Sequence, residues 1–228
     1  MLFSLRISLP DRPGALGAVA TAFGHGGANI LTLEVVESGG VAVDHLVVEA
    51  PEGMQDAVRL ASAAVPGLLI EEIRPVEAFQ HAVSPLGLAA ALTESVDTVV
   101  ATLVERLPEA LRADWCVVLN RGENGLQVLA SGLGAPSLTG VEIPWLPLEA
   151  PTRLLPAAWM PASWTEGPAA RDGQGKFELA AAPLFDPATA VLIGRRRGPL
   201  FRDSEVEQLG LLARVAAASH AQARLAAH

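Results

Sequence analysis

The sequence predicts an α+β fold in two domains, each built around an antiparallel sheet. The chain has 228 residues, a length that suits two small domains. Half of its residues are apolar, which is enough for two packed cores. Apolar residues recur at every second position in some segments and at every third or fourth position in others, which indicates strands and helices in one chain. We place the domains at residues 1–76 and 90–228, joined by a linker at residues 77–89.

The first domain opens with a strand at residues 3–9, where apolar and polar residues alternate as they do when one face of a strand is buried. Residues 10–14 break this strand, and proline suits the first turn of a helix because its missing N–H costs nothing there. A helix should follow and should end at the glycines near residue 26. Its apolar residues have helical spacing at Leu16, Val19, Ala20 and Phe23.

Two further strands are predicted at residues 29–36 and 41–49, with a hairpin turn at residues 38–40. A helix at residues 54–65 and a strand at residues 68–73 complete the domain. The order βαββαβ is that of the ferredoxin-like arrangement, in which two helices cover one face of an antiparallel sheet. Many functions share this topology, so the topology alone does not indicate one.

Two segments of this domain carry a family resemblance. The first is Asp11 to Leu16, with the sequence DRPGAL, followed by Phe23 in the helix, and the second is Gly27 to Ile30, with the sequence GANI. Together with the order of elements, they make residues 2–76 resemble the ACT domain family. The resemblance implies a domain that senses small molecules, typically amino acids, and often regulates metabolism.

The resemblance also implies where a ligand binds, namely between this loop and the start of the neighbouring strand, often at an interface between two ACT domains. Glycine at position 14 lets a ligand approach the backbone, and the first helical turn suits a carboxylate. An acid at position 11 could accept an ammonium group. The implied ligand-binding residues are Asp11, Gly14, Ala15, Leu16, Asn29 and Ile30. As an alternative, Asp11 only stabilises the loop and Asn29 only occupies a turn.

The second domain should begin with a helix at residues 88–107, followed by a hairpin of strands at residues 115–119 and 126–130. Residues 132–175 show little periodicity and contain many prolines, with one or two short helices expected near residues 152–158. Tryptophans in this segment indicate packed structure, and we expect a core role for them rather than a pocket lining. They are Trp145, Trp159 and Trp164.

Strands at residues 177–183 and 190–195 and a final helix capped by Asp203 or Ser204 complete the second domain. The specific segments APL at residue 182, VLIG at residue 191 and PLFRD at residue 199 make residues 90–226 resemble a GAF domain. The resemblance implies a sensory module for cyclic nucleotides or other small molecules, although many GAF domains only dimerise. No segment resembles the acidic motif of the members that bind cyclic nucleotides.

One side of the final helix carries a stripe of apolar and small residues, at Leu209, Leu212, Val215, Ala216, Ser219 and Ala223. This stripe either packs on the domain's own sheet or pairs with a second chain. We favour the second possibility, and so a homodimer, because both of the resembled families usually dimerise.

Charge and composition exclude several classes of protein. A net charge of −9 disfavours binding to nucleic acid, which depends on lysine and arginine. The one basic run, residues 195–197, is interpreted as an exposed rim rather than an anion contact. Cys116 lies in an apolar strand and should be a buried core thiol. His25 and His45 lack the partners of a metal site. With no apolar run of membrane-spanning length and no signal-peptide pattern, a cytoplasmic location away from membranes is expected.

The sequence contains no motif for catalysis, such as a glycine-rich phosphate loop with lysine or a nucleophile elbow. We therefore expect a non-enzymatic regulatory protein that binds a small molecule, most plausibly an amino acid, with no catalytic residues, cofactor or metal. Two alternatives stay open. The chain could be a module that dimerises or assembles without a ligand, or it could be an accessory subunit of a metabolic enzyme, since ACT domains often accompany enzymes.

Overall fold

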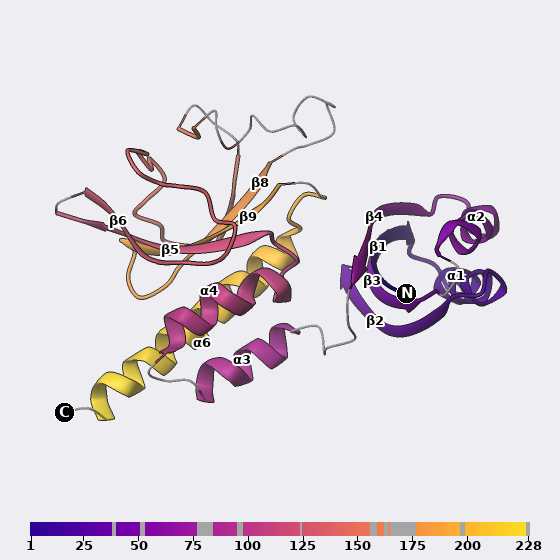
Figure 1. Ribbon diagram of the computed structural model, residues 1–228, viewed down its shortest axis with the longest axis horizontal. Helices are drawn as coiled ribbons and strands as arrows, with labels where there is room; N and C mark the ends of the chain where they lie inside the picture. The colour runs from indigo at the N-terminus through magenta and orange to yellow at the C-terminus, as the bar shows by residue number, and fades with distance from the viewer. Residues whose placement is uncertain are drawn as a thin grey trace. The chain divides into compact units, whose positions relative to one another are not determined.

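The structure is a computed structural model that describes residues 1–37, 40–50, 53–76, 84–94, 98–123, 125–155, 159–161, 164, 177–196 and 199–226. The chain divides into two compact units, a first unit at Met1–Gln80 and a second unit at His81–His228 (Figure 1). Among the described helices, none has the length and apolar character needed to cross a membrane. Residues 38 and 39 of the predicted hairpin turn and residues 77–83 of the predicted linker lie outside the described residues, whereas residues 85–89 of the predicted linker are helical.

The first unit has the predicted βαββαβ order. Its four strands form a sheet in the order β2-β3-β1-β4, in which every neighbouring pair is antiparallel. Helices α1 and α2 lie together on one face of this sheet (Figure 1). The elements are β1 (Leu2–Pro10), α1 (Ala15–His25), β2 (Asn29–Glu37), β3 (Val41–Glu49), α2 (Gln55–Ala64) and β4 (Leu69–Val76).

The core of the first unit lies between the sheet and its two helices. The alternation in β1 puts Leu5, Ile7 and Leu9 into this core, where each is almost fully buried. The two helices approach each other closely at Gly26, because a side chain there would place its Cβ within the backbone of Ala57. The glycine that the sequence uses to end α1 therefore also sets the spacing between the helices.

The second unit is a five-stranded antiparallel sheet in the order β6-β5-β9-β8-β7. Helices α3, α4 and α6 lie on one side of this sheet (Figure 1). The elements are α3 (Pro85–Glu94), α4 (Val99–Ala110), β5 (Trp115–Gly122), β6 (Gly125–Ser131), β7 (Thr152–Leu154), β8 (Glu178–Pro183), β9 (Thr189–Arg195) and α6 (Asp203–Ala226). The predicted order of a helix, two strands, a long connection, two strands and a long helix agrees with the structure except at two places, the first helix and the connection.

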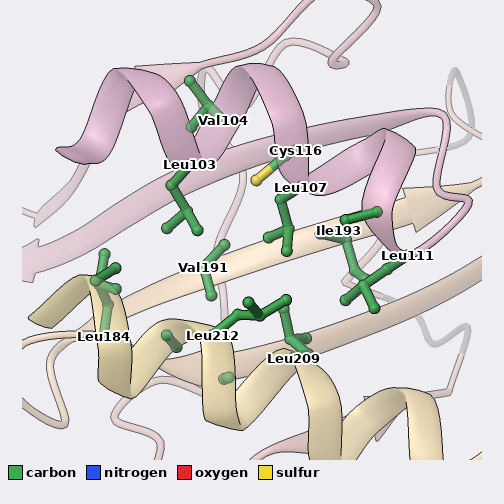
Figure 2. Packing of buried hydrophobic residues seen from close by; sticks show 14 of the residues in the cluster. Leu103, Val104, Leu107, Leu111, Cys116, Leu184, Val191, Ile193, Leu209 and Leu212 are labelled. Carbon is green, nitrogen blue, oxygen red and sulfur yellow. The ribbon is translucent and has the colours of Figure 1, made fainter. Parts of the chain in front are cut away.

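The core on the helical side of the second unit is made by leucines of two helices. Figure 2 shows Leu103 and Leu107 of α4 and Leu209 and Leu212 of α6 directed toward the sheet strand that carries Val191. Cys116 is fully buried in the same cluster, as the sequence predicted. Burial raises the pKa of the Cys116 thiol, so it stays protonated and behaves as a small apolar group.

Two sequence predictions about local structure in this unit were wrong. The helical pattern at residues 88–107 is two helices, α3 and α4, and not one. The segment Thr152–Leu154, expected to be part of a short helix, is strand β7, which pairs with β8. The reason is that β8 would otherwise have an unpaired edge, and the hydrogen bonds of that edge outweigh local propensity.

The predicted core role is confirmed for Trp164, whereas Trp159 also lines a hollow of about 560 Å³. Trp164 is buried on the face of the sheet opposite the helices, against Trp115 and Phe177 at centroid distances of 5.9 and 6.1 Å. Trp145 and Trp159 are partly buried and stack edge to face, with Trp159 also 6.0 Å from Trp164. These aromatic pairs fill the space beneath the long connection between β6 and β8.

The stripe on α6 faces inward and not toward a second chain. Leu209, Leu212 and Ala216 are almost fully buried within the second unit itself, and Ser219 is 2 % exposed. The preferred interpretation of this stripe as a dimer interface was therefore wrong, because the helix needs the stripe to cover its own sheet. If the chain forms a homodimer, as the sequence predicts, its interface has to be a surface other than this stripe of α6.

Arg195 was predicted to belong to an exposed basic rim, and this prediction was also wrong. Its side chain is 1 % exposed and forms an ion pair with Glu205 at 3.0 Å. Its guanidinium donates hydrogen bonds to the carbonyl oxygens of Leu111, Arg112 and Pro199 at 2.7–2.9 Å. Arg196, by contrast, is exposed, and Arg197 lies outside the described residues. An arginine at the end of a buried strand thus joins β9 to the start of α6.

Glu205 also explains how α6 begins. Its second carboxylate oxygen accepts a hydrogen bond from the backbone N–H of Arg202 at 2.7 Å, and Arg202 directly precedes the helix. This is the backbone half of a capping box, in which an acid at the third helical position satisfies the N–H before the helix. Asp203 is the first residue of the helix, and Ser204 Oγ has no hydrogen-bond partner among the described residues, so neither acts as the predicted side-chain cap.

Candidate functional site at the start of helix α1

The loop between β1 and α1 is held at one end of the first sheet. Residues 11–14 make this connection, and the N–H of Asp11 donates a hydrogen bond to the carbonyl oxygen of Gly40 at 3.1 Å. Gly40 immediately precedes β3, so the loop is fixed against the end of the β2–β3 pair. The first helical turn therefore starts from a defined position above the sheet.

Gly14 occupies the N-cap position of α1 with φ of 85°, a left-handed conformation that favours glycine. Among the described residues, no side chain caps this helix, and its first turn contains no acidic residue. The first backbone N–H groups of a helix have no partner within the helix, and they carry the positive end of the helix dipole. The start of α1 can therefore accept an anion such as a carboxylate.

Asp44 is a buried acid of β3 on the side of the sheet that faces this helix. It pairs in register with Ile7 of β1, whose side chain is in the core, so the two side chains share a face. Only 2 % of Asp44 is exposed, and its Oδ1 has no hydrogen-bond partner among the described residues. Burial raises the pKa of Asp44 above its ordinary value, and the negative charge of Asp11 raises it further.

The sequence reasoning missed Asp44, although a signal was present. In the strand at residues 41–49, counting back by twos from the core residues Val48 and Leu46 reaches Asp44. That phase puts a carboxylate on the buried face of the strand, where an isolated charge is costly. A buried acid at such a position indicates either a structural partner or a ligand.

The six predicted ligand-binding residues fall into two groups. Asp11, Gly14, Ala15 and Leu16 lie together at the start of α1, with Ala15 buried and the side chain of Leu16 half-buried. Asn29 and Ile30 begin β2 at the opposite end of the sheet, where Asn29 pairs with Glu49 of β3. A helix of 11 residues, about 16 Å long, separates the two groups. Within one chain they do not form a single site.

Neither histidine of the first unit belongs to this site. His45 faces the other side of the sheet, where its Nε2 lies 2.7 Å from the hydroxyl of Ser4. His25 is exposed at the end of α1. In the part of the chain that the structure describes, there is no group of three or more histidine, cysteine or acidic residues that could hold a metal ion.

The second unit has hollows of its own. One lies between α4 and β6, has a volume of about 840 Å³, and is lined on its strand side by Leu129 and Gly132. Another, of about 830 Å³, lies between β6 and the connection that follows it, with Val128 and Leu138 in its wall. Both are open. The first exposes more apolar than polar surface and is also lined by Glu105 and Asp114, whereas the second exposes more polar than apolar surface.

The first unit is thus a ferredoxin-like α+β domain in which a helix N-terminus lies at one end of a four-stranded antiparallel sheet. Residues 3–73 match the ACT domain family, and this part of the chain is an ACT domain. ACT domains are regulatory domains, which agrees with the expectation from the DRPGAL and GANI segments. None of the curated proteins matches the chain.

Several solved structures resemble the chain at low sequence identity. A GAF domain of a sensor histidine kinase from Pseudomonas syringae pv. tomato is 20% identical, with a TM-score of 0.43, and the match covers 62% of this chain and 88% of that one. A quorum-quenching acylase is 22% identical over 35% of this chain and 44% of its own, with a TM-score of 0.28. A formyltetrahydrofolate deformylase from Pseudomonas putida is 14% identical over 34% of this chain and 30% of its own, also with a TM-score of 0.28.

Proposed function

We propose that this chain is a non-enzymatic regulatory protein whose ACT domain binds a small carboxylate-bearing molecule, an amino acid, at the start of α1. The observation that carries the proposal is the uncapped first turn of α1 behind Gly14, in a domain of a family that senses small molecules. A ligand carboxylate there would accept hydrogen bonds from backbone N–H groups that have no intrahelical partner. Leu16 would contribute its backbone N–H. The N–H of Ala15 already donates a hydrogen bond to the carbonyl oxygen of Arg12 at 3.2 Å, so Ala15 would only line the site, and Asp11 would face the ligand from the loop.

Asn29 and Ile30 enter this proposal through a second copy of the chain. Strand β2 is at an edge of the sheet, and its residues Leu33 and Val35 are 42% and 56% exposed. If two β2 strands pair in antiparallel fashion, the start of one strand lies beside the end of the other. That pairing would bring Asn29 of one chain toward the loop at Asp11 of its partner. We therefore propose a homodimer through β2, with the ligand site at the interface.

The second unit is proposed to be a GAF-like domain that reads the state of the ACT domain. The order of its elements supports this assignment, since helices cover one face of an antiparallel sheet. Described residues that follow β6, among them Leu138 and Leu146, pack in the separate core cluster on the other face. Its tryptophan cluster fills the same face, so no ligand is proposed for it. Ligand binding in the first unit would act by changing the interface between two chains.

A thermal-shift screen against the twenty common amino acids tests the proposed function. A ligand that binds only the folded protein at a hundred times its Kd stabilises it by about 2.7 kcal/mol, which raises Tm by a few degrees. The variant Gly14→Val should lose the shift, because a β-branched residue disfavours the left-handed conformation and fills the approach to the helix. Gly125→Val is the matched control, because Gly125 also has positive φ and open space around it but lies in the second unit.

Two results would replace this proposal. If no amino acid changes Tm while the protein stays a dimer at low concentration, the chain is an assembly module that works without a ligand. If the shift appears only when a metabolic enzyme is co-purified with the chain, it is an accessory subunit whose site is completed by that enzyme. Sedimentation of the free protein with and without amino acid separates these cases.

A further inference from the structure

Asp44 is difficult to explain by the stability of the fold. It is 2% exposed, it lies on the core-facing side of β3, and its Oδ1 accepts no hydrogen bond from any described residue. A carboxylate that leaves water without a partner costs stability, and a valine or leucine at this place would cost none. A buried acid that lowers the stability of the fold in this way is typical of a ligand-binding site.

Asp44 also lies beside the place where the proposed ligand binds. It is level with Ile7 of β1, three residues before that strand ends at Pro10. Helix α1 begins just beyond this end and runs back over the same face of the sheet. The charge of Asp11 is near enough to act on Asp44. The acid and the first turn of α1 thus belong to the same end and the same face of the unit.

The two features have opposite electrostatic character. The start of α1 attracts an anion, whereas Asp44, together with Asp11, attracts a cation. In an α-amino acid, one carbon atom separates the carboxylate from the ammonium group. A molecule with both groups on adjacent atoms can satisfy the helix N–H groups and the buried carboxylate at once. A simple carboxylate would leave Asp44 unpartnered and would add a third negative charge beside two acids.

We propose that Asp44 recognises the protonated amine of the ligand, so that the site takes free α-amino acids and rejects their N-acylated and deaminated counterparts. This inference rests on the proposed function and makes it more specific. The ammonium group donates a hydrogen bond to Oδ1 of Asp44 and supplies the positive charge that the buried carboxylate lacks. Val35, which pairs with Asp44 across β2 and β3, lies beside it at the exposed edge of the sheet.

The test uses the full chain with each of the twenty amino acids and with the N-acetyl derivative and the 2-hydroxy acid of each one that binds. The wild-type protein should bind the free amino acid at least about tenfold more tightly than either derivative, which is the usual effect of one charge-assisted hydrogen bond. Equal binding of an N-acetyl derivative would overturn the role of Asp44. This comparison needs no variant and so does not depend on how a variant folds.

A pair of variants tests the residue itself. Asp44→Asn keeps the shape of the side chain and removes the charge, and it should weaken binding by about tenfold or more while leaving Tm of the free protein equal or higher. Asp56→Asn is the matched control, because the side chain of Asp56 is 74% exposed on α2. A lower Tm with unchanged affinity in Asp44→Asn would show a structural role and overturn the inference. If instead no amino acid binds the wild-type protein, the proposed function itself fails.

Discussion

The two units of this protein bury charge in different ways. In the second unit, Arg195 and Glu205 are both almost fully buried, and each has partners that satisfy its charge. Phe201 adds a ring face 4.1 Å from the guanidinium carbon of Arg195. In the first unit, Asp44 is just as deeply buried, yet one of its oxygens has no partner among the described residues. The first arrangement joins elements of the fold, whereas the second leaves a buried carboxylate oxygen available for the proposed ligand.

Removing Glu205 should have the largest effect. The variant Glu205→Ala leaves the buried Arg195 without its ion-pair partner and removes the backbone cap of α6, so the free energy of unfolding should fall by about 3–5 kcal/mol. Urea denaturation followed by tryptophan fluorescence measures this loss, since all four tryptophans lie in the second unit. The control is Glu207→Ala, two residues further along α6 and exposed. If the free energy of unfolding falls by less than about 1 kcal/mol, the ion pair of Arg195 and Glu205 does not stabilise the second unit as proposed, and the two units do not differ in this respect.

Asp44→Asn should move stability in the opposite direction. Replacing an unpartnered buried carboxylate by a neutral amide of the same shape should raise the free energy of unfolding by about 1 kcal/mol at pH 7. Far-ultraviolet circular dichroism during urea denaturation follows both units and reports this change. Should the variant be less stable than the wild type, Asp44 has a structural partner and resembles Glu205 after all.

The smallest expected effect is the pH dependence of the stability difference between Asp44→Asn and the wild-type protein. The pKa of Asp44 is raised in the folded state, so its protonated form is favoured there. Below its unfolded pKa of about 3.9, Asp44 is protonated in both states and lowers the free energy of unfolding little relative to a neutral residue. As pH rises through the folded pKa, Asp44 lowers the free energy of unfolding progressively more. The stability gap between Asp44→Asn and the wild type should therefore be small near pH 4 and grow toward pH 7. A constant gap over this range would mean that charge burial is not its cause.

The sequence predicted the first unit well because its elements are set by local patterns. Alternation places β1 and β3, and prolines and glycines mark the ends of α1 and α2. The second unit depends more on distant partners. Thr152–Leu154 becomes a strand only because β8 offers an edge, and Arg195 is buried only because Glu205 and three carbonyl groups surround it. Local propensity does not predict such distant partners.

In the candidate site, too, the residues set by a local motif were predicted, and those placed by distant partners were not. Gly14 and its loop were predicted from a local motif, whereas Asp44 becomes part of the site only when β3 is placed between β1 and β2. The relation of Asn29 to the loop was less accessible, because the length of α1 keeps the two apart in one chain. The proposed symmetric pairing of two chains would relate them, and periodicity in a single sequence does not reveal such a pairing.

The two edges of the first sheet also differ, and this difference bears on how copies of the chain can associate. Strand β4 contains Pro75 next to its last residue, where no N–H is available to donate, and it carries an ion pair between Arg74 and Glu72 at 2.6 Å. Strand β2 exposes Leu33 and Val35, and β4 exposes Leu69 and Ile73. Pairing of β2 with itself is isologous and closes after two chains, whereas pairing of β2 with β4 would be heterologous and would form a ring or a filament. The proline and the ion pair of β4 disfavour its pairing with another chain, and so they favour the proposed closed pair through β2.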